Sequence, residues 1–136
     1  MKPRGLRNNN PLNIRHNADL FQGEIKGNDK LFKTFSSMPY GYRAAFVILA
    51  TYLSKGYNTI EKIISRWAPP SENNTQAYIL TVVKYSGVAA DEVLTATSGD
   101  KYILIVSAMS FVENGVNAYI NQIRAGFALQ DKITTQ

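Results

Sequence analysis

The apolar residues of the chain are spaced differently before and after residue 36. From Ser36 onward they recur at intervals of three and four residues, the spacing typical of helices that bury one face. Capping residues and glycines interrupt this pattern. The predicted helices lie between Ser36 or Ser37 and Gly56, from Asn58 to Trp67, from Asn73, Asn74 or Thr75 to Gly87, from Tyr102 to Glu113, and from about Tyr119 to Asp131.

Two capping details complete this prediction. A short helical turn is expected over Asp91–Leu94, and Ser98 or Asp100 is the expected cap of the apolar helix that follows. Asn58-Thr59-Ile60-Glu61 resembles a capping box, with Glu61 as part of the cap.

The first part of the chain predicts loops and a small β-hairpin. Residues 1–18 are polar and contain the turn-forming cluster Asn8-Asn9-Asn10-Pro11. Leu20–Glu24 and Leu31–Phe35 are short aromatic segments on either side of Gly27-Asn28-Asp29, which is typical of a hairpin. With 136 residues and no repeat or linker, the sequence predicts a single domain over residues 1–136, mainly α-helical with one hairpin.

Composition excludes several classes of chemistry. The chain has one histidine and no cysteine, so no zinc site of the usual kind is expected. No Walker loop, dinucleotide-binding glycine pattern or nucleophile elbow occurs, and we expect no cofactor. No apolar segment has the length of a membrane span or of a signal peptide. We therefore expect synthesis in the cytoplasm without a signal peptide and no membrane insertion.

The net charge of +5 is concentrated at one end of the chain. Residues 1–43 carry eight lysines and arginines against three acids, whereas the remaining residues carry seven of each. This excess favours a polyanionic partner, such as nucleic acid, an acidic envelope polymer or a membrane surface, or it serves only solubility. The basic residues are scattered through predicted loops without a recognition helix, so nucleic acid is not the expected partner.

Carboxylates are the remaining candidates for catalysis, and Glu113 is the strongest. It ends a helix whose preceding residues, Ile103–Val112, are nearly all small or apolar. Partial desolvation and the negative end of the helix would both raise the pKa of this carboxyl, as a general acid in glycoside cleavage requires. The alternative is a solvated residue just before the helix end at Asn114-Gly115.

Two further acids are candidates for the other half of such a reaction. Glu24 lies in the predicted hairpin, where it either projects over a cleft or is a solvated strand residue. Glu72 lies in a loop and either faces the same groove or caps a helix.

Amide and aromatic side chains supply the usual means of binding sugars, with amides for the hydroxyl groups and rings for the C–H faces. The alternative for Trp67, the single tryptophan, is a place in the core. The candidate substrate-binding residues are Asn8, Asn9, Asn10, Asn13, Tyr40, Tyr42, Trp67, Asn73 and Asn74.

Several strings resemble a family of phage and prophage proteins described as virion structural proteins or lysozyme-like endolysins. The resemblance covers about the whole chain and is carried by Arg4–Arg15 (RGLRNNNPLNIR), Phe21-Gln22-Gly23, Phe32–Phe35, Tyr40–Ala44, Asn58-Thr59-Ile60, Ile63–Thr75 (IISRWAPPSENNT) and Tyr78. It implies a protein that acts at the cell wall or as part of a phage particle.

The order of these strings is also similar to bacterial glucosaminidases of the lysozyme superfamily. In those enzymes a helix carrying the catalytic glutamate precedes the Asn-rich segment. Here, Met109–Gly115 looks like that helix but follows the segment. The resemblance therefore implies a circularly permuted lysozyme-like domain with Glu113 as the acid. Phe21 stands where tryptophan is commoner in those enzymes.

Two functions follow from this combination. The first is cleavage of the glycan strand of peptidoglycan by a muramidase, glucosaminidase or lytic transglycosylase, with Glu113 as general acid and with Glu24, Glu72 or the substrate's own N-acetyl group completing the reaction. The second is a non-catalytic cell-wall-binding or virion structural protein. The sequence leaves the oligomeric state open.

Overall fold

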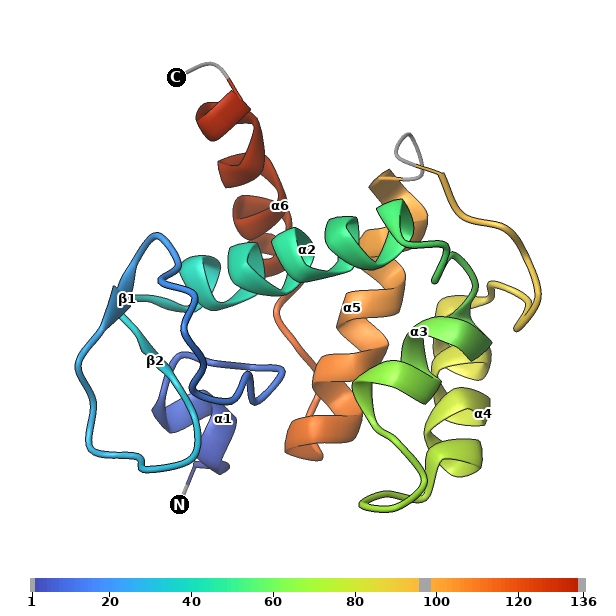
Figure 1. Cartoon of the computed structure of the whole chain (residues 1–136), viewed down its shortest axis with the longest axis horizontal. Helices are drawn as coiled ribbons and strands as arrows, with labels where there is room; N and C mark the ends of the chain where they lie inside the picture. Colours follow the sequence, from blue (N-terminus) through green and yellow to red (C-terminus); the bar gives the residue numbers. More distant parts are fainter. Residues whose placement is uncertain (1, 96–98, 135–136) are drawn as a thin grey trace.

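The computed structural model describes residues 2–95 and 99–134 and is mainly helical. Figure 1 shows α2 running across the molecule, with α5, α3 and α4 on one side of it and the N-terminal segment with the hairpin at its beginning. The elements in chain order are α1 (Arg4–Arg7), β1 (Glu24–Ile25), β2 (Thr34–Phe35), α2 (Met38–Ser54), α3 (Ile60–Trp67), α4 (Thr75–Ser86), α5 (Gly99–Asn114) and α6 (Ile120–Thr134).

The core forms where α2 packs against α6 and α5 packs against α4. The most enclosed apolar side chains come from α2, α3, α4, α5 and α6 and include Leu49, Ile63, Val82, Met109 and Ile123, each fully buried. Because burial of apolar surface is the main favourable contribution to folding, this cluster fixes the relative positions of the helices. The predicted fold class, mainly α with a small hairpin, is confirmed.

Most helix ends lie where the sequence predicts them. Thr59 caps α3 by accepting a hydrogen bond from the backbone N–H of Lys62, and Asn74 caps α4 by accepting one from Ala77. The N-cap is therefore Thr59, one residue later than the predicted capping box implies, and Glu61 lies in the first turn of α3 without completing a box. Gly87 ends α4 in the left-handed conformation, at φ +73°.

Three local predictions need correction. Asp91–Leu94 is not helical: a turn at Asp91 is followed by residues without regular structure. The backbone N–H of Leu94 donates to the carbonyl of Asn58, and the Leu94 side chain is buried. Asp100 lies inside the first turn of α5 and is not its cap, while Ser98 lies outside the described residues. The short helix α1, which follows Pro3, has no counterpart among the predicted elements.

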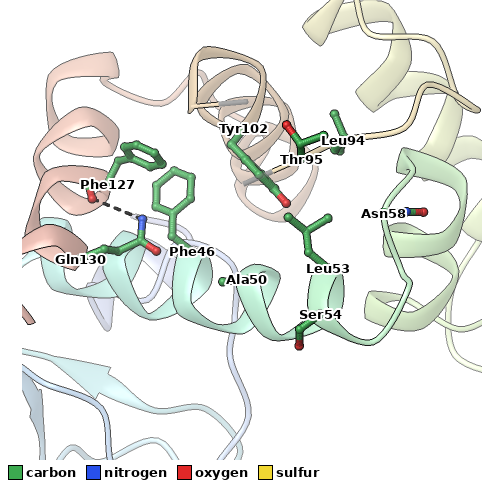
Figure 2. Close-up of a pocket in the computed structure, with 10 residues that line it drawn as sticks. All are labelled: Phe46, Ala50, Leu53, Ser54, Asn58, Leu94, Thr95, Tyr102, Phe127 and Gln130. Atoms are coloured by element: carbon green, nitrogen blue, oxygen red, sulfur yellow. Dashed lines mark hydrogen bonds between the residues drawn. The ribbon is translucent and has the colours of Figure 1, made fainter. Parts of the chain in front are cut away.

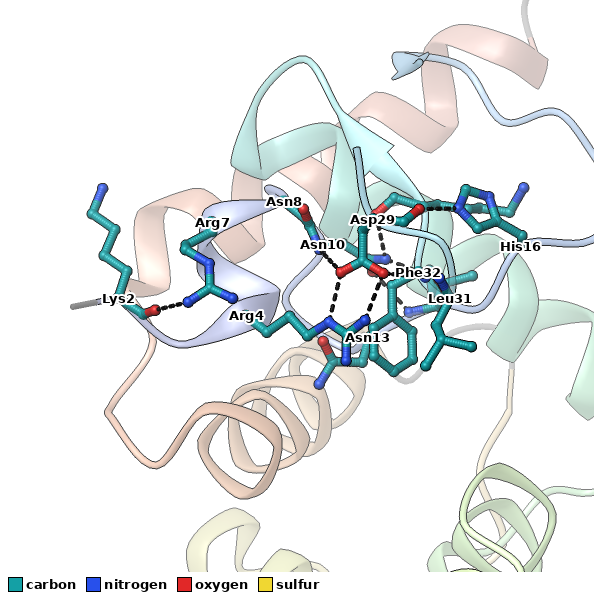
Figure 3. Close-up of polar contacts among 12 residues, drawn as sticks. Lys2, Arg4, Arg7, Asn8, Asn10, Asn13, His16, Asp29, Leu31 and Phe32 are labelled. Atoms are coloured by element: carbon teal, nitrogen blue, oxygen red, sulfur yellow. Dashed lines mark hydrogen bonds and ion pairs between the residues drawn. The ribbon is translucent and has the colours of Figure 1, made fainter. Parts of the chain in front are cut away.

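The hairpin is shorter than predicted, and side-chain contacts hold its connecting loop. Its antiparallel strands pair Glu24 with Phe35 and Ile25 with Thr34. In the loop, both oxygens of the Asp29 carboxylate accept hydrogen bonds from Arg4, at 2.6 and 2.8 Å (Figure 3). These bonds hold the pKa of Asp29 well below its usual range. The hairpin loop is thereby tied to α1.

Gly5 marks the closest approach between α1 and the end of α5. A Cβ atom at this buried residue would lie 2.6 Å from Oδ1 of Asn114 and 2.9 Å from Oδ1 of Asn13. Nδ2 of Asn114 in turn donates to the backbone carbonyl of Pro11 at 2.8 Å. The N-terminal segment therefore packs directly on the C-terminal turn of α5, and only glycine fits at the contact.

We expect Gly5→Ala to lower the free energy of unfolding by about 1–3 kcal/mol, the usual cost of forcing extra volume into a packed site. Urea denaturation followed by circular dichroism measures this change. Arg7→Ala, at an exposed residue of the same helix, serves as the control and should remain within about 0.5 kcal/mol of wild type. Equal stability of the Gly5→Ala and Arg7→Ala variants would show that the contact tolerates a methyl group.

Candidate functional site

A groove of about 660 Å³ separates the N-terminal segment from the helices. One wall carries Asn13, Arg15 and Phe21, α2 contributes Ile48 and Tyr52, and α3 contributes Trp67. We call this feature the groove. It combines exposed polar side chains with flat aromatic faces, the combination that a sugar-binding site requires.

Glu113 lies in the last turn of α5, and both of its carboxyl oxygens are hydrogen-bonded. It is not among the residues that line the groove, but one of its two partners is. Nδ2 of Asn13, which itself lines the groove, donates to Oε1 at 2.9 Å. The hydroxyl of Tyr78 in α4 donates to Oε2 at 2.9 Å. Glu113 is half-buried and bonded from two sides, so it is not the solvated helix-end residue of the alternative interpretation.

The surroundings of Glu113 act on its pKa in opposite directions. Burial raises the pKa of the carboxyl, whereas the hydrogen bonds from Asn13 and Tyr78 lower it, and the net effect is a raised pKa. Burial also raises the pKa of Tyr78 well above its ordinary value, assisted by the charge of Glu113. Tyr78 therefore stays protonated and acts as a donor.

This arrangement suits a group that gives up a proton. Burial favours the neutral acid before the reaction, because a low-dielectric site penalises the carboxylate. Once the proton has left, the two donors stabilise the negative charge that remains. The same carboxyl is thereby equipped to donate a proton and to take one back.

Asn13 is positioned by a tight loop that depends on Asn10. The backbone of Asn13 lies in the left-handed region, at φ 53°, which asparagine tolerates better than most residues. Asn10 is fully buried: its Oδ1 accepts from the N–H of Ile14, and its Nδ2 donates to the carbonyls of Ile14 and Lys33. The Asn-rich string therefore builds the support for one donor to Glu113.

Tyr78 is the residue that the sequence-based site prediction missed. Its apolar spacing assigns it only to the buried face of α4, where it is indeed 6% exposed. Nothing local marks the hydroxyl, because its partner lies 35 residues further along the chain. The one available signal was the presence of Tyr78 among the strings that resemble the phage and prophage family.

Glu24 does not project freely over the groove. Its oxygens accept hydrogen bonds from Nζ of Lys33, at 3.0 Å each, and Oε1 also accepts from the backbone N–H of Phe21. Lys33 is 1% exposed, and its third bond goes to the carbonyl of Asp19. A buried cation with three partners neutralises this carboxylate, so Glu24 holds the hairpin and is neither a free base nor a solvated strand residue.

Glu72 lies on the loop between α3 and α4 and faces the groove wall. Oε1 of Glu72 is 3.8 Å from a guanidinium nitrogen of Arg15, and both side chains are more than half exposed. Arg15 lines the groove. Glu72 is therefore the one predicted second acid that lies at the edge of the groove and can still reach a ligand.

Three asparagines of the predicted sugar-binding set have structural partners instead. Nδ2 of Asn8 donates to Asp29, and Nδ2 of Asn9 donates to the carbonyl of Phe35. Asn10 is buried as described above. The amides of these three residues hold the N-terminal segment together. Because Asn10 is fully buried, it cannot contact a sugar.

The two predicted tyrosines also belong to the packing. Tyr42 is 1% exposed, and its hydroxyl is 2.9 Å from Oγ of Ser110, so its predicted contact with a sugar is wrong. The ring of Tyr40 lies directly under Gly23, where a Cβ atom would be 2.3 Å from it. It supports the turn before β1 and is not among the residues that line the groove.

Of the remaining candidates, Trp67 lines the groove, whereas Asn73 and Asn74 are not among its lining residues. Trp67 is half-buried, lines the groove and packs edge-on against Tyr52, with 6.1 Å between the ring centroids. Asn73 donates to the carbonyl of Pro69, while Asn74 caps α4. Both asparagines are exposed. Of the predicted site residues, Asn13 and Trp67 thus line the groove. Glu113 is connected to it through the hydrogen bond from Asn13, and Glu72 through its ion pair with Arg15.

The described residues contain no group of three or more histidine, cysteine, aspartate or glutamate side chains arranged to hold a metal ion. Within the same residues, every helix is too short or too polar to cross a membrane.

Comparison with known proteins identifies a phage relative. No family model matches the chain. Over 130 residues the chain is 42% identical to protein P5 of the Pseudoalteromonas phage PM2, and the match covers 91% of this chain and 79% of that protein.

Because the pKa of Glu113 is raised in the folded state, its ionised carboxylate should lower the free energy of unfolding near neutral pH. Below about pH 4 the carboxyl is protonated in both the folded and the unfolded chain, but at higher pH the folded state resists its ionisation. We therefore expect Glu113→Gln to become progressively more stable than wild type between about pH 4 and pH 7.

Urea denaturation at several pH values measures this difference. Glu61→Gln, which removes an exposed acid from α3, controls for the general effect of losing a negative charge. A difference between Glu113→Gln and wild type that stays constant over this pH range would contradict the assignment.

Proposed function

We propose that this chain, which belongs to the same family as protein P5 of the Pseudoalteromonas phage PM2, cleaves the glycan strand of peptidoglycan with Glu113 as general acid. The observation that carries the proposal is the half-buried carboxyl of Glu113, hydrogen-bonded by Tyr78 and by Asn13, which lines an aromatic groove. The match to a phage protein is in keeping with a role at the host cell wall.

In the proposed reaction the glycan lies along the groove, with a sugar face against Trp67. Glu113 protonates the glycosidic oxygen, and the bond to the anomeric carbon breaks as positive charge develops on the sugar. Asn13 and Tyr78 stabilise the carboxylate that Glu113 becomes. Glu113 then accepts the proton of the attacking hydroxyl, which comes from water or from the sugar itself.

The charge that develops on the sugar requires a second group. Glu24 is neutralised by Lys33 and is a poor candidate. Glu72 carries an exposed carboxylate at the edge of the groove, although Arg15 lies 3.8 Å from it. The N-acetyl group of the substrate is the other candidate, and it needs no protein carboxylate.

We propose further that the fold is a circularly permuted lysozyme-like domain. The end of α5 packs on the Asn-rich segment through Asn114 and Pro11, although these residues are 103 positions apart. In the enzymes that the chain resembles, the glutamate helix precedes the Asn-rich segment. The contact therefore joins in space two segments whose order in the sequence is reversed.

The proposal predicts that wild type releases new sugar ends from purified peptidoglycan and that Glu113→Gln loses at least about 100-fold of this activity, the usual contribution of a general acid. Mass spectrometry of the soluble products distinguishes reducing ends from anhydro-sugars and so identifies the reaction. Glu61→Gln, which removes an exposed acid away from the groove, should keep full activity.

Tyr78→Phe tests the hydrogen bond separately from the acid. Losing one bond to the developing carboxylate should lower the rate about 10- to 100-fold and should shift the pH limb assigned to Glu113 toward higher pH, because this bond lowers the pKa of the acid. A different outcome would support the alternative function. If wild type sediments with the cell wall but releases no product, the chain is a non-catalytic wall-binding or virion protein.

A further inference from the structure

A second concave site lies between α2, α6 and the N-terminal end of α5. It is a pocket of about 530 Å³, within the range typical of small-molecule sites. Figure 2 shows its lining, in which Phe46 and Phe127 face each other at one end and Leu53 lies near Tyr102. Tyr102 and Glu113 are eleven residues apart on α5, about 16 Å along the helix, so this pocket is separate from the groove.

The hydroxyl of Tyr102 is the unusual feature of the pocket. Tyr102 is 6% exposed, and its hydroxyl oxygen is buried without a hydrogen-bond partner among the described residues. The hydroxyl lies at the wall of the pocket, next to Leu53 (Figure 2). Burial raises the pKa of Tyr102 to about 12, so the group remains a proton donor near neutral pH. A buried donor without an acceptor is unfavourable, and a ligand that brings an acceptor removes the penalty.

The other lining residues indicate which acceptor fits. The walls are mainly apolar, with Phe46, Leu53, Leu94 and Phe127 around the space. Among the described lining residues none is charged. A carboxylate or phosphate placed beside Tyr102 would therefore lose its hydration without gaining a counter-ion, which is strongly disfavoured. A neutral carbonyl group has a much smaller free-energy cost of desolvation in the same place.

We propose that this pocket binds the acyl chain of a neutral ester, with the chain among the apolar residues and the ester carbonyl accepting a hydrogen bond from the hydroxyl of Tyr102. The proposal is independent of glycan cleavage, since it uses none of the residues that line the groove or contact Glu113. It gives the chain a lipid-type ligand in addition to the proposed glycan.

Isothermal titration calorimetry with glycerol monooctanoate, below its micelle concentration, tests the proposal on the full chain. We expect saturable binding by wild type, and affinity lower by about tenfold in Tyr102→Phe, which loses one hydrogen bond but keeps the ring. Tyr85→Phe removes an exposed hydroxyl from α4 and is the matched control, which should bind like wild type.

A second pair of variants tests the location without removing the tyrosine. Ala50 is an exposed lining residue at the edge of the pocket, so Ala50→Trp should obstruct the pocket and abolish binding without disturbing the core. Ala77→Trp, at an exposed position of α4 outside the pocket, should bind normally.

Three results would overturn the proposal. They are absence of binding to wild type, unchanged affinity in both Tyr102→Phe and Ala50→Trp, and binding of octanoate at neutral pH at least as tight as binding of the ester. None of these measurements uses peptidoglycan, so failure here leaves the proposed glycan cleavage to be judged on its own assay.

Discussion

The position of Glu113 depends on one hydrogen bond that joins segments 100 residues apart, from the amide of Asn13 to Oε1 of the acid. This bond requires the N-terminal segment to pack on the last turn of α5, which the close contact at Gly5 and the bond from Asn114 to Pro11 provide. Tyr78 adds the second bond from α4. The packing of three separate parts of the chain therefore determines the environment of one carboxyl.

Two ion pairs in the first third of the chain contribute to this packing. Arg4 forms an ion pair with Asp29, and the buried Lys33 forms one with Glu24. Both pairs fix the loops that carry Asn13 and Phe21 to the groove. Arg15, which is 65% exposed, and the exposed Arg66 of α3 are basic residues of the groove wall that an anionic ligand can reach. The positive excess of this region is thus partly structural.

The sequence predicted the elements better than the site. Periodic apolar residues with local caps placed α2 to α6 within a few residues, because these signals are local. The raised pKa of Glu113 also followed from its own helix. Its partners Asn13 and Tyr78, and the neutralisation of Glu24 by Lys33, depend on tertiary contacts that no local pattern encodes. The one sign that Lys33 points inward was its position two residues before the buried Phe35, because residues two apart lie on the same face of a strand.

Burial in the fold raises the pKa of the Glu113 carboxyl, and the hydrogen bonds from Asn13 and Tyr78 stabilise the carboxylate that remains after proton transfer. Carbon-13 NMR titration of the Glu113 carboxyl, in wild type and in Tyr78→Phe, tests this most directly. We expect a pKa above the ordinary glutamate value of about 4.3 in wild type and a higher pKa still in the variant. A wild-type pKa at or below the ordinary value would contradict it.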